Sequence, residues 1–119
     1  MDTRLGKIEG CFADLIWELQ PVTTRELIKQ CSERFEWKRT TTYTVLKKLC
    51  NKGLFKTEDG IVTALISRDE YSAAKSTQFI DDFFSGSLPA FLNAFSAAHK
   101  LNDDELKELQ KMIDLMKSP

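Results

Sequence analysis

The apolar residues of the first half of the chain recur at helical spacing in three segments. The first segment spans residues 5–19 and stops at Pro21, because proline cannot continue a helix. The second runs from Thr23 to about residue 35, and the third follows a short link, residues 36–39. Gly53 ends the third segment with a residue suited to the left-handed conformation of a helix cap. The pattern therefore predicts three consecutive helices.

Two short runs that favour β-strands follow the third helix. Leu54–Thr57 and Ile61–Ile66 flank Glu58-Asp59-Gly60, and an Asp-Gly pair between such runs is a strong signal for a β-hairpin. Three helices followed by a hairpin predict a winged helix-turn-helix. In such domains the third helix enters the major groove of DNA, and the hairpin lies beside the backbone or over the minor groove.

The remaining residues again show helical spacing, but they are rich in phenylalanine. Ser67 and Glu70 have the spacing of a capping box, Ser85-Gly86-Ser87 interrupts the pattern, and Asn102 opens a last helix. About fifty residues are close to the size below which a single core is marginal, so we expect this region to dimerise. The residues predicted at the dimer interface are Phe79, Phe83, Phe84, Leu88, Phe91, Leu92, Phe95, Leu109, Met112 and Ile113. The alternative is that these helices fold back on the winged domain.

Together these elements predict a mainly α protein. We expect a winged helix-turn-helix domain of three helices and a β-hairpin wing over residues 1–66. A helical dimerisation domain would follow over residues 67–119. A chain of 119 residues is long enough for one small domain with such an appended segment.

The charge of the chain is balanced overall but uneven locally. The formal net charge is -1, yet residues 1–66 hold 11 basic and 9 acidic side chains, and residues 67–119 hold 6 and 9. No acidic residue lies between Trp37 and Thr57, where six lysine and arginine side chains are found. Because affinity for nucleic acid follows the phosphates neutralised at the contact, this distribution predicts a local binding patch rather than a wholly basic surface.

Helical periodicity divides the third helix into two faces. Thr42, Val45, Leu46, Leu49 and Cys50 fall on the face that we expect to pack. The opposite face has hydroxyl groups in its first turns and lysines further on, so hydroxyls and methyls could reach base edges while ammonium groups meet phosphates. The predicted DNA-binding residues are Lys38, Arg39, Thr40, Thr41, Tyr43, Thr44, Lys47, Lys48, Asn51 and Lys52. The alternative is an ordinary lysine-rich surface helix.

Other features of the chain bound its class. No apolar run approaches the ~20 residues needed to cross a bilayer, and the N-terminus lacks the pattern of a signal peptide, so we expect a cytoplasmic protein. Cys11, Cys31 and Cys50 are widely spaced and odd in number, which predicts neither a disulfide framework nor a metal site. We expect each cysteine to be a small buried residue, and we expect no cofactor.

Four stretches of the chain carry a resemblance to a known family. They are Leu15-Ile16-Trp17-Glu18-Leu19, Val22-Thr23-Thr24-Arg25-Glu26-Leu27, residues 37–49 with Lys52-Gly53, and Phe84-Ser85-Gly86-Ser87-Leu88. In this order they resemble the BlaI/MecI/CopY family of penicillinase, methicillin-resistance and copper-responsive repressors. The resemblance implies a homodimeric transcriptional repressor that binds a palindromic operator. It also implies groove and phosphate contacts by Thr41, Tyr43, Thr44 and Lys48, although Tyr43, at the flank of the helix, could equally be a packing residue.

Three departures from the family pattern affect this expectation. Relatives switched by a protease carry an Asn-Phe pair where this chain has Ala94-Phe95, and copper-responsive relatives carry Cys-x-Cys motifs near the C-terminus that residues 115–119 lack. Both departures argue against those release mechanisms and leave open a ligand in the phenylalanine-rich region, cysteine oxidation or protein level alone. The wing also lacks the arginine common after the family's turn glycine, so more of the affinity would fall to Lys47, Lys48 and Lys52.

An enzyme is not expected. His99 is the single histidine, and the spacing reveals neither a glycine-rich phosphate loop nor a Ser/His/Asp or Cys/His set. We expect His99 to be solvated or at the edge of the dimer. The rival function is a winged domain used for protein association, in which the basic helix docks on an acidic partner instead of a duplex.

Overall fold

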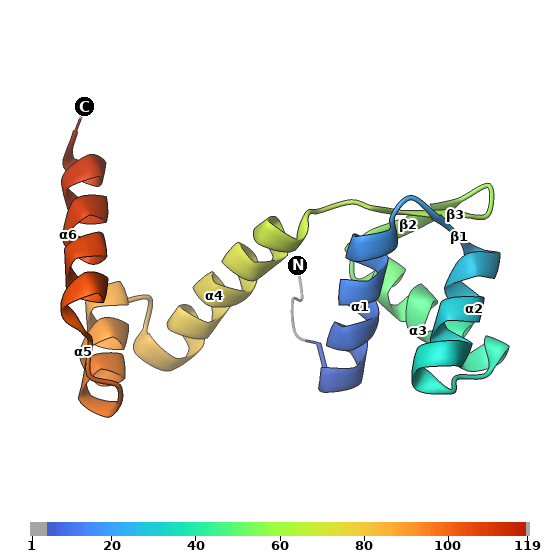
Figure 1. Cartoon of the computed structure of the whole chain (residues 1–119), viewed down its shortest axis with the longest axis horizontal. Coiled ribbons are helices and arrows are strands. Elements are labelled where there is room, and N and C mark those ends of the chain that lie inside the picture. Colours follow the sequence, from blue (N-terminus) through green and yellow to red (C-terminus); the bar gives the residue numbers. More distant parts are fainter. Residues whose placement is uncertain (1–4, 119) are drawn as a thin grey trace. The chain divides into compact units, whose positions relative to one another are not determined.

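The computed structural model of the chain describes residues 5–118. Along the chain the elements are α1 (Lys7–Leu19), β1 (Val22–Thr23), α2 (Thr24–Phe35), α3 (Arg39–Asn51), β2 (Phe55–Glu58), β3 (Ile61–Ala64), α4 (Arg68–Phe84), α5 (Leu88–Ala98) and α6 (Asp103–Lys117) (Figure 1). They form two compact units, Met1–Gln78 and Phe79–Pro119, and α4 contributes to both. The predicted fold class, a mainly α winged helix followed by a helical region, is confirmed.

The first unit, hereafter the winged unit, is built on one hydrophobic core. Its helices α1, α2 and α3 lie on the same side of the small sheet (Figure 1). Phe12 and Ile16 of α1, Leu27 of α2, Leu49 of α3 and Val62 of β3 are all 0% exposed. These residues are the apolar stripes that the helical and alternating patterns place on one face of each element, so the core follows directly from the periodicity.

The sheet of the winged unit has the order β1-β3-β2, and both pairs are antiparallel. Phe55 pairs with Ala64 at one end of the hairpin, and Asp59 and Gly60 have φ values of 53° and 73° at the turn. Two successive positive φ values match the type I′ turn that an Asp-Gly pair favours, so the predicted hairpin is confirmed. The strand β1 was not expected from the sequence, because two residues are too few to show an alternating pattern.

Two predicted helix starts differ in detail. At α2, Thr23 accepts a hydrogen bond from the Glu26 amide, but the Glu26 carboxylate accepts from the Gln30 side chain rather than from Thr23. Thr23 and Glu26 have the spacing of a capping box, but only half of that box forms. At α4, Ser67 and Glu70 exchange both hydrogen bonds, at 3.0 and 3.2 Å, as the box requires.

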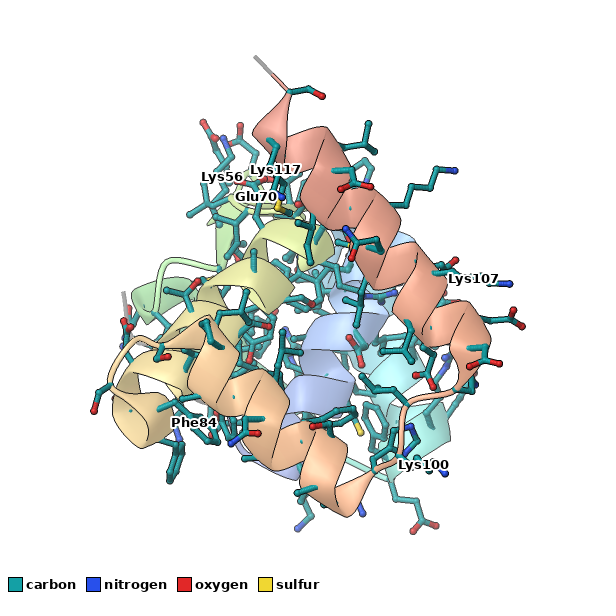
Figure 2. The ribbon with its side chains drawn as sticks, turned by 90° about the vertical axis from the view of Figure 1, so that its left-hand side faces the viewer. Lys56, Glu70, Phe84, Lys100, Lys107 and Lys117 are labelled. Atoms are coloured by element: carbon teal, nitrogen blue, oxygen red, sulfur yellow. The ribbon has the colours of Figure 1, made fainter. Side chains whose placement is uncertain are left out.

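The second unit, hereafter the C-terminal unit, consists of the end of α4 with α5 and α6. Ser85 and Gly86, with φ values of 50° and 79°, end α4, and Asn102 forms a complete capping box with Glu105 at the start of α6. Figure 2 shows Lys100 in the connection between α5 and α6 and Lys107 projecting outward from α6. Neither α5 nor α6 has a buried residue in the single chain.

The division between the compact units falls inside α4, whereas the sequence predicts a domain boundary between residues 66 and 67. The start of α4 packs on α1: Tyr71 is buried, and its ring centroid lies 5.3 Å from that of Trp17. The Arg68 guanidinium lies 3.4 Å from the Asp14 carboxylate. The first turns of α4 thus belong to the winged unit by packing, while the assignment of separate DNA-binding and dimerisation domains stays a prediction.

One expectation about the cysteines is wrong. Cys31 is buried and Cys50 is half-buried, but Cys11 is exposed. Cys11 lies on the flank of α1 beside Ile8, which is itself 65% exposed, and outside the stripe formed by Phe12, Leu15 and Ile16. The apolar pattern of the first turns therefore extends beyond the surface that the core covers.

Candidate nucleic-acid interface

The helix α3 has one buried and one exposed face. Thr42, Leu46 and Leu49 are at most 4% exposed and hold the helix on the core. The opposite face is solvent-exposed, as the periodicity predicts, and it consists of Lys38, Arg39, Thr40, Thr41, Tyr43, Thr44, Lys47, Lys48 and Asn51. Lys52, at the C-cap, is half-buried. The structure thus brings together the predicted site residues on one surface, while their contact with DNA stays a prediction.

Hydroxyl hydrogen bonds orient two threonines of α3. The Thr42 hydroxyl donates to the Lys38 carbonyl at 3.3 Å, which satisfies a polar group on the buried face. The Thr44 hydroxyl donates to the Thr40 carbonyl at 2.9 Å. Because the Thr44 proton is used inside the helix, this side chain offers an outside partner a methyl group and the lone pairs of its oxygen.

The N-terminus of α3 is electropositive. Lys38 occupies the N-cap without a side-chain cap, and the first turn holds no acidic residue. Unpaired amides and the positive end of the helix dipole favour an anion at such a terminus, and two cationic side chains, Lys38 and Arg39, are unfavourable there for the helix itself. The arrangement fits an anionic partner better than it fits an isolated helix.

Tyr43 lies on the side of α3 that borders the wing. Tyr43 is 40% exposed, and its ring lies under the Arg39 guanidinium, whose central carbon is 5.6 Å from the ring centroid. With Lys47 and Thr57 it lines a shallow hollow of about 300 Å³. The ring is therefore neither buried in the core nor fully free, and both of its predicted roles remain compatible with this position.

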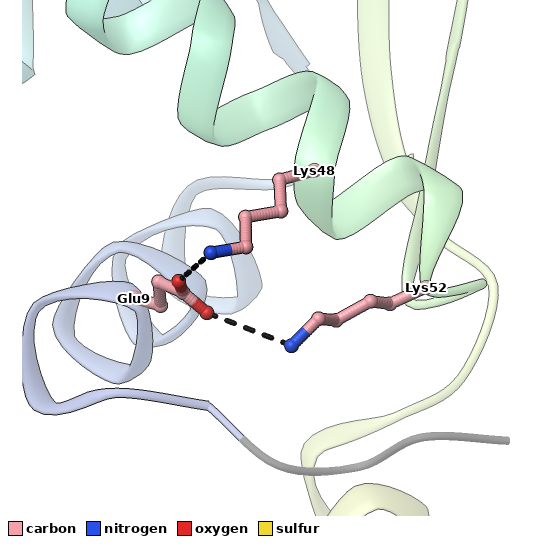
Figure 3. Close-up of polar contacts among 3 residues, drawn as sticks. All are labelled: Glu9, Lys48 and Lys52. Carbon is pink, nitrogen blue, oxygen red and sulfur yellow. Dashed lines mark hydrogen bonds and ion pairs between the residues drawn. The ribbon is translucent and has the colours of Figure 1, made fainter.

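A carboxylate from α1 reaches the lysines of α3. Glu9 Oε1 accepts a hydrogen bond from Lys48 Nζ at 2.6 Å, and Glu9 Oε2 lies 3.7 Å from Lys52 Nζ (Figure 3). The hydrogen bond from Lys48 holds the pKa of Glu9 below its usual range. The stretch that lacks acids in the sequence thus has an acid beside it in space. No local pattern could reveal Glu9, because the contact depends on how α1 crosses α3.

The wing offers charges of both signs. Lys56 Nζ lies 3.3 Å from the Glu58 carboxylate, and Asp59 is exposed at the turn. Ile61, which occupies the place of the missing arginine, is 43% exposed. With one lysine against two carboxylates, the hairpin presents no net positive charge to a phosphate backbone.

The C-terminal unit exposes most of its predicted interface. Among the ten residues, Phe79, Phe83, Leu88, Phe95, Met112 and Ile113 are between 42% and 70% exposed in the single chain. The others, Phe84, Phe91, Leu92 and Leu109, are half-buried. Three further exposed apolar residues of α6, Leu106, Leu115 and Met116, were missing from the predicted set although they share its apolar character.

Other kinds of site find little support in residues 5–118. No group of three or more His, Cys, Asp or Glu residues there could hold a metal ion, and no helix there is long and apolar enough to cross a membrane. The side chain of His99 is exposed, and its ring centroid lies 5.1 Å from that of Phe95. Its Nε2 atom lies 3.8 Å from the Glu105 carboxylate.

Comparison with known proteins agrees with the geometry of the site. The family model described as penicillinase repressor matches residues 5–115. The penicillinase repressor of Bacillus licheniformis is 29% identical to this chain over 104 residues, which cover 84% of this chain and 81% of that protein. The match extends over both compact units, and so over α3 and the phenylalanine-rich helices alike.

Proposed function

The chain belongs to the penicillinase repressor family of transcriptional repressors, and we propose that it acts as a homodimer that binds a palindromic operator through α3. The observation that carries this proposal is the exposed face of α3, which combines hydroxyls near an electropositive helix N-terminus with lysines toward the other end. That order fits a helix whose first turns read base edges in the major groove while its last turns rest on phosphates.

Within this interface we assign different roles to two side chains. Lys48 is exposed and cationic, so it meets a phosphate and contributes equally to every sequence. Thr44 directs its hydroxyl proton into its own helix, so it reads a base mainly through its methyl group. A thymine methyl in the major groove is the natural apolar partner for such a group.

The exposed apolar surface of the C-terminal unit supports the proposed homodimer. A unit of about forty residues cannot bury a core of its own, and α5 and α6 leave their large apolar side chains exposed. A second copy covers such a surface with an identical one, and it supplies a second reading helix. Two-fold pairing of the protein then matches the two-fold symmetry of a palindrome.

The test first selects an operator by enriching the duplexes that the protein binds from a random pool. It then titrates that operator and a scrambled duplex at several salt concentrations. We expect Lys48→Ala to weaken binding to both duplexes alike and to lower the salt slope by about 0.9 per subunit. Lys107→Ala is the matched control, because Lys107 is exposed on α6 and its loss changes the net charge equally. Loss of affinity for only one duplex in Lys48→Ala would contradict the phosphate role.

Substitutions of Thr44 test base reading separately. Thr44→Ser removes the methyl and Thr44→Val removes the hydroxyl, so we expect the serine variant to lose preference among bases and the valine variant to keep it. One good base contact is worth about 1–3 kcal/mol of discrimination.

The same measurements test the competing function, in which α3 docks on an acidic protein. Such a surface would show salt-dependent binding to any polyanion but no preference for one sequence. Failure to enrich any palindrome from random duplexes, with wild-type protein, would therefore overturn the proposed function.

We further propose that the protein works in the cytoplasm without catalytic activity, and that an inducer of unknown chemistry releases it.

A further inference from the structure

The two lysines that share the Glu9 carboxylate differ in their freedom. The side chain of Lys48 is 57% exposed, whereas those of Lys52 and Glu9 are each 18% exposed. Figure 3 shows Glu9 between the two ammonium groups. Lys48 can therefore turn away from Glu9 toward solvent, while the other two groups remain held against the protein surface.

A phosphate and the Glu9 carboxylate compete for the same donor. Lys48 Nζ lies 2.6 Å from Glu9 Oε1, which is a full charge-assisted hydrogen bond. Lys48 belongs to the surface that, under the proposed function, neutralises DNA. To reach a phosphate it must leave the carboxylate, and the carboxylate then remains beside a polyanion.

We propose, on the basis of the proposed function, that Glu9 is a built-in attenuator that weakens the binding of α3 to DNA of every sequence by opposing the charge of Lys48. In each subunit, the Glu9 carboxylate thereby lowers by one the net positive charge that the C-terminal part of α3 presents to DNA. Since non-specific affinity consists almost wholly of phosphate neutralisation, such a device limits how firmly the repressor is held on DNA outside its operator.

The attenuation is permanent at ordinary pH. The hydrogen bond from Lys48 keeps the pKa of Glu9 below its usual range, so the carboxylate stays ionised at neutral pH in the free protein. Glu9 is therefore a fixed part of the interface, and we expect no change in its effect between pH 6 and pH 8.

The experiment compares Glu9→Gln with wild type on a non-operator duplex of fixed length. The amide keeps the size of the side chain but removes its charge. We expect binding about fivefold to tenfold tighter per subunit at 0.1 M salt, and a salt slope steeper by about 0.9 per subunit. The matched control is Glu18→Gln, an exposed carboxylate on the same helix, which should change neither quantity.

A second background shows whether Glu9 acts through Lys48. In the Lys48→Met background, the gain in log affinity from Glu9→Gln should fall to less than half. The cation that donates the short hydrogen bond to Glu9 is then gone, and Lys52, at 3.7 Å, is the cation that remains beside the carboxylate. Glu9→Ala, which removes the carboxylate without adding an amide, should reproduce the tighter binding of Glu9→Gln in the wild-type background. Thermal melting of each variant checks that the winged unit is still folded.

The possible results separate this inference from the proposed function. If Glu9→Gln binds like Glu18→Gln, or more weakly than wild type, Glu9 only positions Lys48 and the attenuator is overturned while DNA binding stands. If the wild-type protein shows no salt-dependent binding to any duplex, the proposed function falls, and the attenuator falls with it.

Discussion

The winged unit and the C-terminal unit differ in what they bury. Phe12, Leu27, Leu49 and Val62 of the winged unit are completely covered, whereas no residue of α5 or α6 is buried in the single chain. The two units have similar chemistry, since both are helical and rich in aromatic contacts. In the winged unit, one copy of the chain covers the core aromatic side chains from solvent, and in the C-terminal unit it does not cover the phenylalanines.

The aromatic contacts of the two units make this difference concrete. The Phe12 ring lies 5.3 Å from the Trp37 ring, and Phe12 is 0% exposed. The Phe79 ring lies closer still to Phe83, at 4.9 Å, yet the two residues are 46% and 70% exposed. Contact between rings is therefore not burial, and the transfer free energy of the C-terminal phenylalanines is still available to a partner. The winged unit thus covers its own core within one chain, whereas the C-terminal unit leaves apolar rings exposed that the proposed dimer would cover.

The largest expected effect comes from opening the core of the winged unit. Phe12→Ala removes a fully buried ring and should lower the free energy of unfolding by about 3–5 kcal/mol. Urea titration followed by tryptophan fluorescence measures this, because both tryptophans, Trp17 and Trp37, lie in the winged unit. A loss below about 1 kcal/mol would show that the core is not the main source of stability in this unit.

A charge on the exposed cluster should have the next largest effect. Phe83→Glu places a carboxylate on a residue that is 70% exposed in the single chain and covered in the proposed dimer. We expect the dissociation constant of the dimer to rise about a hundredfold, because burying the new carboxylate without a partner costs roughly 3 kcal/mol. Sedimentation at several concentrations measures it, and the urea midpoint of tryptophan fluorescence should change little.

The winged unit provides a matched control for that substitution. Ile8 is 65% exposed on α1, so Ile8→Glu introduces the same charge on an equally exposed apolar residue of the other unit. It should leave the dimer intact. Equal dissociation in both variants, or none in either, would mean that the exposed phenylalanines are not the dimer interface.

The elements of the winged unit were largely predictable because each follows a local rule. Helical spacing gave α1, α2 and α3, and the Asp59-Gly60 pair gave the hairpin. The same spacing separated the two faces of α3, and Thr42, which it places on the packed face, is buried with its hydroxyl bonded to the Lys38 carbonyl of the preceding turn. Periodicity suffices where a side chain interacts with its own element.

Features that depend on packing between elements were not predictable. Glu9 meets Lys48 only because α1 crosses α3 at that point, and β1 exists only because Val22 pairs with Val62. The start of α4 joins the winged unit through the contact of Tyr71 with Trp17. The error at Cys11 has the same origin, because a sequence stripe does not say where the covering surface ends.

The reactivity of the cysteines reports on the opening of the winged unit alone, since all three cysteines precede residue 79. Burial raises the pKa of the Cys31 thiol to about 11 from 9.0, opposed by the hydrogen bond with Thr42. A raised pKa favours the neutral thiol, so at pH 8 only about one folded molecule in a thousand would carry the thiolate. The contribution of the buried Cys31 thiol to the free energy of unfolding is complete below pH 9. It declines as the pH rises from 9 toward 11, because the thiol ionises in the unfolded chain before it ionises in the folded one.

The smallest expected effect concerns the rate at which Cys31 is alkylated, which should not change when the dimer is lost. At pH 8 an alkylating reagent should modify the exposed Cys11 rapidly, and Cys31 only when the winged unit opens. Mass spectrometry of Cys31 labelling should give the wild-type rate in Phe83→Glu, because loss of the dimer leaves the winged core closed. In Phe12→Ala the rate should rise by a hundredfold or more, in proportion to the open population. Faster labelling in Phe83→Glu would show that the C-terminal unit supports the winged core, and the two units would then not be independent in stability.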